Sequence, residues 1–169
     1  MHTVHETTIH APPAAVFGIG VDIERWPALD PAYRWCRILE RDDTRTVFEM
    51  AGNIRGWPGR WTAVQERFPG DRRIVFTHLR GITTGMRVAW DIRDAGQAAV
   101  LRITHELALQ WPLIGPVVSD RIIGPIFIDW IARRTLRAVR RAAESRTNLA
   151  GTSSDPAASS GQVRTGETR

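Results

Sequence analysis

Apolar and polar residues alternate along much of the chain, which is the pattern of β-strands that bury one face. The alternation predicts consecutive strands over 35–41, 46–51, 60–68, 73–80, 86–93 and 100–109. Turn-forming residues separate them, at Asp42-Asp43, Gly52-Asn53, Pro69-Gly70-Asp71, Gly81 and Asp94-Ala95-Gly96. Short turns between successive strands are typical of an antiparallel meander.

A further strand and two short helices are predicted before the meander. Residues 3–9 are rich in β-branched side chains and form the strand, and the apolar residues 14–21 form the first helix. Asp22 is a helix start signal, and we expect Pro27 to end this second helix. Trp26 and Tyr33 then lie near a chain reversal, where aromatic side chains either fill a core or line the mouth of a cavity.

The period of the pattern changes after Pro112 and predicts one long helix. Gly124-Pro125 has the residues typical of a helix start. The apolar positions at helical spacing are Ile128, Ala132, Leu136, Val139 and Ala143. Arginines occupy mostly the other side, at 133, 134, 137, 140 and 141. A helix of about twenty residues would cover one face of the sheet, and the space between them is either packed or hollow.

The pattern assigns one domain to residues 1–146 and a tail to 147–169. The tail is rich in Ser, Thr, Gly and Ala, has almost nothing to bury, and is expected to be disordered. Residues 111–131 are the only segment apolar enough to suggest a membrane span. Asp120, Arg121 and Asp129 interrupt it, so a core helix is the favoured interpretation.

Composition narrows the class of protein. A hydrophobic fraction of 43% and a charged fraction of 24% are typical of a soluble globular domain. The net charge is +5, and Arg supplies all 23 of the basic side chains because the chain has no Lys. A positive net charge favours an anionic partner. No nucleic-acid recognition motif accompanies the arginines. A single cysteine, Cys36, and no signal peptide predict a cytoplasmic protein without an internal disulfide.

Three of the predicted strands carry polar side chains whose burial the pattern leaves open. His105 shares a face with Ile103 and Leu107, and is either a satisfied core histidine or a buried acid or base. Trp61, Gln65 and Arg67 share a face, so Arg67 either lies at the surface or enters a cavity, where it needs a carboxylate, water or a ligand oxygen. Arg80 carries the same ambiguity.

The chain lacks the common catalytic and metal motifs. It has no paired-cysteine metal spacing, no Gly-rich phosphate loop and no Gly-x-Ser-x-Gly elbow. His2, His5 and His10 lie on a polar strand without a further metal ligand nearby and are expected to be exposed. We therefore expect no metal site.

An ordered set of short motifs resembles a known family. They are Ile9-His10-Ala11-Pro12, Val16-Phe17, Asp22-Ile23-Glu24-Arg25-Trp26-Pro27, Tyr33, Trp61 to Arg67 followed by Pro69, Met86 to Trp90, and His105-Glu106-Leu107. Together they resemble the START-like (SRPBCC) polyketide aromatase/cyclases of bacterial type II pathways. The similarity spans about residues 4–143.

The resemblance implies an α+β helix-grip fold, in which a seven-stranded antiparallel sheet wraps around a long C-terminal helix over an internal hydrophobic cavity. It implies a cofactor-free aldol cyclisation and dehydration of a poly-β-ketone on an acyl carrier protein, with possible contacts to polyketide synthase components. The implied catalytic residues are Arg67, Tyr33 and His105. The implied substrate-binding residues are Trp26, Trp61, Gln65, Arg80, Met86 and Trp90.

The same fold also serves proteins that bind without catalysis, so the alternative is a carrier or sensor of a quinone or lipid. A cavity with convergent polar groups favours catalysis, and a wholly apolar one favours carriage. Gln65 stands where some family members have serine, and no acidic partner for His105 is evident in the last helix. Ring position, chain length and the choice between monomer and homodimer stay open.

Overall fold

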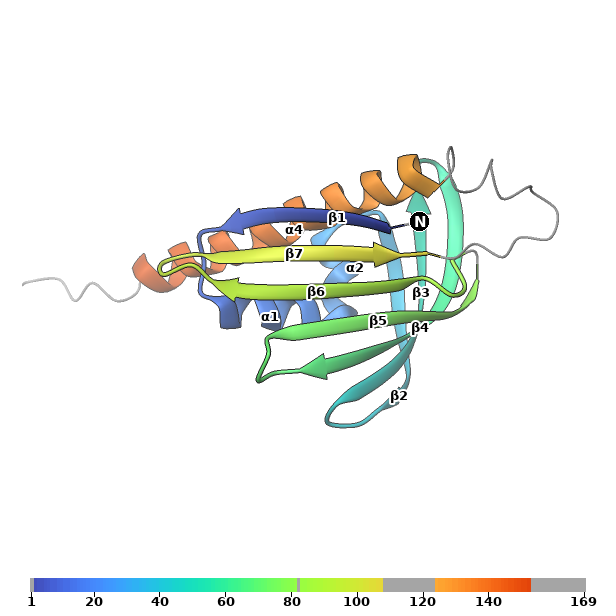
Figure 1. The fold of residues 1–169 in the computed structure, drawn as a ribbon, viewed down its shortest axis with the longest axis horizontal. Coiled ribbons are helices and arrows are strands. Elements are labelled where there is room, and N and C mark those ends of the chain that lie inside the picture. The colour runs from blue at the N-terminus through green and yellow to red at the C-terminus, as the bar shows by residue number, and fades with distance from the viewer. Residues whose placement is uncertain (1, 82, 108–123, 153–169) are drawn as a thin grey trace, which may run out of the picture.

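The computed structural model describes residues 2–81, 83–107 and 124–152, which form a curved antiparallel sheet with helices on one face (Figure 1). The seven strands follow the order β1-β7-β6-β5-β4-β3-β2. Their bounds are β1 (His2–Ile9), β2 (Tyr33–Arg41), β3 (Arg45–Ile54), β4 (Trp57–Phe68), β5 (Arg73–Gly81), β6 (Arg87–Asp94) and β7 (Ala99–Glu106). The predicted meander and the predicted N-terminal strand are confirmed, and β1 joins the sheet beside β7.

The helices are α1 (Pro13–Val21), the 3-10 helix η1 (Ile23–Arg25), α2 (Trp26–Leu29) and α4 (Gly124–Thr152). The long helix α4 crosses behind the sheet in Figure 1, with α1 and α2 on the same side. This arrangement confirms the helix-grip fold. Within the described residues, no helix is both long and apolar enough to cross a membrane.

The hydrophobic core lies between the concave face of the sheet and α4. All five apolar positions predicted at helical spacing on α4 are buried, from Ile128 to Ala143. The close approach of α1 to the sheet depends on Gly20, because a Cβ there would lie 2.6 Å from Ile74 Cδ1 and 3.0 Å from the Trp90 ring. A larger residue would push α1 away from the aromatic centre of the core.

A predicted helix end and a predicted turn differ in the structure. Pro27 does not end its helix but occupies the first turn of α2, where a backbone N–H has no helical partner to lose. The turn expected at Gly52-Asn53 lies further along, at Arg55-Gly56, because both of these residues have positive φ and Ile54 pairs with Trp57. This is the geometry of a tight two-residue hairpin.

The C-terminal helix extends beyond its predicted length. It spans 29 residues and continues to Thr152, into the segment assigned to the tail. Residues 153–169 lie outside the described residues, as does most of the apolar segment 111–131. Asp129, at the end of that segment, lies on α4 and is half-exposed.

Candidate active site

A mainly apolar cavity separates the concave face of the sheet from α4. It is lined by Trp26, Tyr33, Phe48, Met50, Trp61, Phe76, His78, Thr83, Met86, Val88, Trp90, Ile103, His105, Ile128, Ile131, Ala132 and Thr135. Its volume is about 80 Å³, below the several hundred Å³ of pockets that enclose a whole drug-sized ligand. A long flexible substrate therefore fits this cavity only with part of its length.

Aromatic side chains form the inner wall. Trp26 stacks on Trp90 with ring centroids 5.3 Å apart and an interplanar angle of 16°, and Phe76 packs against both rings. Trp26 also donates a hydrogen bond from Nε1 to the carbonyl oxygen of Ile19, at 3.1 Å. Trp26 therefore both holds the turn after α1 and lines the cavity.

Tyr33 presents a hydroxyl group beside this wall. Its Oη lies 2.9 Å from Thr135 Oγ1 of α4, and its ring packs against Trp26 at 5.3 Å. Burial raises the pKa of Tyr33 to about 12, partly opposed by the hydrogen bond with Thr135. At neutral pH Tyr33 is therefore a phenol, able to donate a hydrogen bond but not to act as a base.

A buried ion pair fixes the start of β2 against α4. Asp30 is 2% exposed, and its Oδ1 accepts hydrogen bonds from Arg134 Nε at 2.6 Å and from the backbone N–H of Ala32 at 2.7 Å. Arg134 also lies over the Trp130 ring. Because Tyr33 follows Asp30 closely and Thr135 follows Arg134, the ion pair sets the position of the Tyr33–Thr135 hydrogen bond.

The ionisation of Tyr33 provides a direct test of its burial. Tyr33 is the chain's only tyrosine, and without Lys no ammonium group titrates nearby. We expect phenolate absorbance to appear with a midpoint near pH 12 rather than the model-compound value of 10. The folded state keeps its proton where the unfolded state has lost it, so the free energy of unfolding falls between about pH 10 and pH 12. Tyr33→Phe should abolish the absorbance change, and a midpoint near 10 would contradict the buried placement.

His78 lies at the other side of the cavity. Its ring stacks on Trp61 at 6.0 Å and 11°, and its Nδ1 lies 2.5 Å from Thr83 Oγ1 in the turn between β5 and β6. Burial, with a smaller contribution from nearby His105, lowers the pKa of His78 to about 3. The side chain is therefore a neutral imidazole whose orientation is fixed by a hydroxyl group and an aromatic ring.

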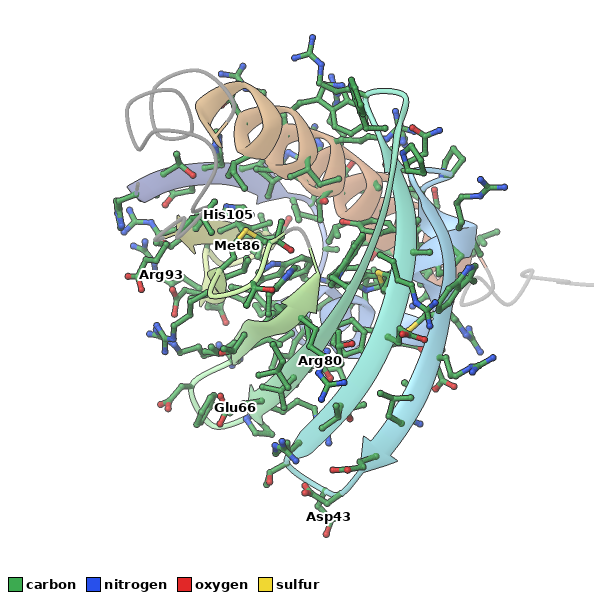
Figure 2. All side chains as sticks on the ribbon, turned by 90° about the vertical axis from the view of Figure 1, so that its right-hand side faces the viewer. Asp43, Glu66, Arg80, Met86, Arg93 and His105 are labelled. Atoms are coloured by element: carbon green, nitrogen blue, oxygen red, sulfur yellow. The ribbon has the colours of Figure 1, made fainter. Side chains whose placement is uncertain are left out.

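His105 extends from β7 into the same space, close to Met86 (Figure 2). It is 5% exposed, and burial lowers its pKa to about 4, with His5 as a second cause. Its Nδ1 is buried without a hydrogen-bond partner. No other group of the described residues satisfies this nitrogen, although most buried polar atoms have a hydrogen-bond partner in the protein or in an ordered water.

Arg67 does not line the cavity, contrary to the expectation. Its guanidinium donates hydrogen bonds to Thr46 Oγ1 at 2.6 Å, Gln65 Oε1 at 3.1 Å, and the carbonyl oxygens of Asp42 at 2.5 Å and Arg45 at 3.3 Å. It does extend from the inner face, but it lies six residues beyond Trp61, which is roughly 20 Å along a strand. Arg67 thus holds the turn between β2 and β3.

Gln65 and Arg80 also lie outside the cavity lining. Gln65 is fully buried, and its Nε2 donates to the carbonyl oxygens of Gly20 and Val21 at 3.1 and 3.3 Å. Arg80 is exposed because a bulge interrupts the pairing of β4 with β5, where Thr62 pairs with Arg80 but Ala63 pairs with His78. The extra residue reverses the alternation and directs Arg80 outward.

The structure thus brings together six of the nine predicted site residues: Trp26, Tyr33, Trp61, Met86, Trp90 and His105. Sequence reasoning missed His78, Thr83 and Thr135, which complete the polar part of the cavity. The sequence did contain a signal for His78, because the alternation in β5 places it on the same face as the buried Phe76. Among the described residues, no three His, Cys, Asp or Glu side chains are grouped to hold a metal ion.

Comparisons with known proteins find relatives that are named polyketide cyclases. A putative polyketide cyclase of Streptomyces cyaneus is 28% identical over 113 residues, which are 64% of this chain and 74% of that protein. The granaticin polyketide synthase bifunctional cyclase/dehydratase of Streptomyces violaceoruber is 30% identical over 103 residues, or 58% of this chain and 32% of that protein. These relatives support a polyketide cyclase role.

A solved structure shares the fold. The Zhui aromatase/cyclase of Streptomyces sp. R1128 superposes with a TM-score of 0.77 at 20% identity, covering 89% of this chain and 98% of that one. The sequence profile of the family described as polyketide cyclase / dehydrase and lipid transport matches residues 9–140. The chain therefore belongs to the polyketide cyclase / dehydrase and lipid transport family.

Proposed function

We propose that this protein catalyses the aldol cyclisation and dehydration of a poly-β-ketone held on an acyl carrier protein. The observation that carries the proposal is His105, a neutral imidazole in an aromatic cavity that also presents the hydroxyl groups of Tyr33 and Thr135. A neutral imidazole can accept a proton from carbon, and the aromatic walls bind a flat, partly conjugated chain. A wholly apolar cavity would instead favour carriage of a hydrophobic ligand.

The reaction begins with His105 removing one proton from a methylene group between two carbonyls of the substrate. The C–H electron pair becomes an enolate, whose carbon attacks a second ketone carbon and forms the C–C bond. The electron pair of that C=O bond moves to oxygen, and the imidazolium returns its proton to the alkoxide. In the dehydration His105 removes a second proton next to the new carbinol carbon and the C–H electron pair forms the C=C bond. The C–O bond breaks as the imidazolium gives its proton to the departing oxygen, which leaves as water.

Charge develops on oxygen in each of these steps, so hydrogen-bond donors must face the substrate oxygens. The resemblance implied Arg67 as a catalytic residue, but its guanidinium donates its hydrogen bonds to Thr46, Gln65 and the β2–β3 turn. Tyr33 is a donor that does line the cavity, and its raised pKa keeps the proton available for a hydrogen bond. Trp26, Trp61 and Trp90 restrict how the chain folds, which converts binding into orientation.

The test is product analysis with a minimal polyketide synthase, with and without this protein. We expect a defined cyclised and dehydrated product to replace the mixture that forms spontaneously. The net charge of +5 favours an acidic carrier protein as the form in which the substrate is delivered. An unchanged product profile would refute the proposal. If the protein also bound a quinone or lipid stoichiometrically, that result would favour the carrier function.

A further inference from the structure

Three buried polar atoms near one end of the sheet have no hydrogen-bond partner. They are Thr3 Oγ1, His5 Nε2 and His105 Nδ1. Most buried polar atoms in folded proteins have a partner, either in the protein or in an ordered water. Three exceptions on two neighbouring strands therefore point to a shared cause.

The strand register places the three side chains together. Thr3 of β1 pairs with His105 of β7, and His5 pairs with Ile103. In an antiparallel pair, opposite residues extend to the same face with Cβ atoms about 5 Å apart, and diagonal neighbours are within reach of long side chains. Thr3 is thus the direct neighbour of His105, and His5 is its diagonal neighbour on the inner face.

A carboxylate from α4 borders this group. Asp129 Oδ1 lies 3.3 Å from His5 Nε2, although the two atoms are not aligned for a direct hydrogen bond. Asp129 Oδ2 accepts from Arg133 Nε at 2.9 Å, and the Asp129 side chain is 42% exposed. The strand register and this contact thus place polar side chains from the cavity-lining His105, by way of Thr3 and His5, toward a half-exposed carboxylate.

We propose that Thr3, His5 and His105 hold a buried water that links the cavity imidazole to Asp129. A buried water typically makes about two to four hydrogen bonds, and the three atoms with the nearby carboxylate supply up to four partners. The functional part of this inference rests on the proposed function. Within it, His5 and Asp129 are positioning residues that act through His105.

The water addresses a difficulty of the reaction. While His105 holds the substrate proton, it is an imidazolium in an apolar cavity, which is costly unless the charge is compensated. A water that accepts from the Nδ1–H and is itself polarised toward Asp129 spreads that charge toward the surface. It also selects the tautomer in which Nδ1 carries hydrogen and Nε2 has the free electron pair that removes the substrate proton.

The structural test is a high-resolution crystal structure of the full chain without substrate. We expect an ordered water within hydrogen-bond distance of Thr3 Oγ1 and His105 Nδ1, and its loss in the His5→Phe variant. Long-range ¹H–¹⁵N spectra of the imidazoles should show hydrogen on Nδ1 of His105. Absence of the water, or hydrogen on Nε2 alone, would overturn the inference whatever reaction the protein catalyses.

The kinetic test compares His5→Phe and Asp129→Asn with His2→Phe, an exposed histidine on the outer face of the same strand. We expect kcat for cyclisation to fall about tenfold in the first two variants, as for other residues that orient a catalytic group, while KM and the product pattern stay unchanged. The control should match the wild type. Unchanged kcat in both variants would overturn the positioning role. If the wild-type protein does not cyclise the substrate, the proposed function fails. The crystal structure then still shows whether the buried water is present.

Discussion

Replacing His105 with Phe is expected to lower the rate of cyclisation by about 10²- to 10⁴-fold, the range for loss of a general acid or base. Phenylalanine has a similar size and fills the same space, so the walls of the cavity keep their shape. It also removes a buried nitrogen that has no partner in the protein, and replacing such an atom by an apolar group costs little stability. The variant therefore separates chemistry from folding.

The measurement is the initial rate of product formation with a minimal polyketide synthase and excess His105→Phe protein. His2→Phe provides the matched control, because His2 is exposed at the start of β1. Circular dichroism and denaturant unfolding should show that both variants fold as the wild type does. A His105→Phe protein with the wild-type rate and product would remove His105 from the mechanism.

Replacing Trp90 with Ala is expected to lower the free energy of unfolding by about 3–5 kcal/mol, as for other buried aromatic residues. Trp90 is 2% exposed, stacks on Trp26, and contacts Phe76 edge-on at 5.9 Å. Its ring also lies against the backbone of Gly20 in α1. Its removal leaves a void at the point where α1, the sheet and the cavity wall meet, and the rigid neighbours cannot fill it.

Urea denaturation followed by circular dichroism measures this loss directly. The control is Trp57→Ala, since Trp57 is 76% exposed beside the hairpin turn of β3 and β4. Surface substitutions of this kind change stability by about 0.5 kcal/mol or less. Equal losses in the two variants would contradict the placement of Trp90 at the centre of the aromatic wall.

Local patterns in the sequence predicted most of the fold because each depends on neighbouring residues only. Alternation in β6 and β7 placed Trp90 and His105 on the inner face, where the structure has them. The helical spacing from Ile128 to Ala143 identified the face of α4 that covers the sheet. In both cases the side-chain direction follows from the period of a regular element.

The predictions failed where a bulge interrupts the alternation of a strand. They also failed where the face of a side chain was correct but its distance along the strand from the cavity was unknown. The bulge between β4 and β5 reverses the pattern at Arg80, and nothing in the local sequence marks it. Arg67 does extend from the inner face, but the cavity occupies the other end of β4. A guanidinium can lie on the inner face if backbone carbonyl oxygens accept its hydrogen bonds. A sequence pattern does not reveal which carbonyl oxygens are within reach.

The sequence by itself determined the strands, the covering helix and most of the residues that face inward, because burial imposes a period on every regular element. Only the tertiary structure decided which inward residues meet. It joined Tyr33 to Thr135 across a hundred residues of chain, placed His78 against Trp61 and Thr83, and left His105 beside the cavity with an unpaired nitrogen. These contacts depend on sheet curvature, bulges and the seating of α4, which are set by packing between distant segments rather than by local pattern.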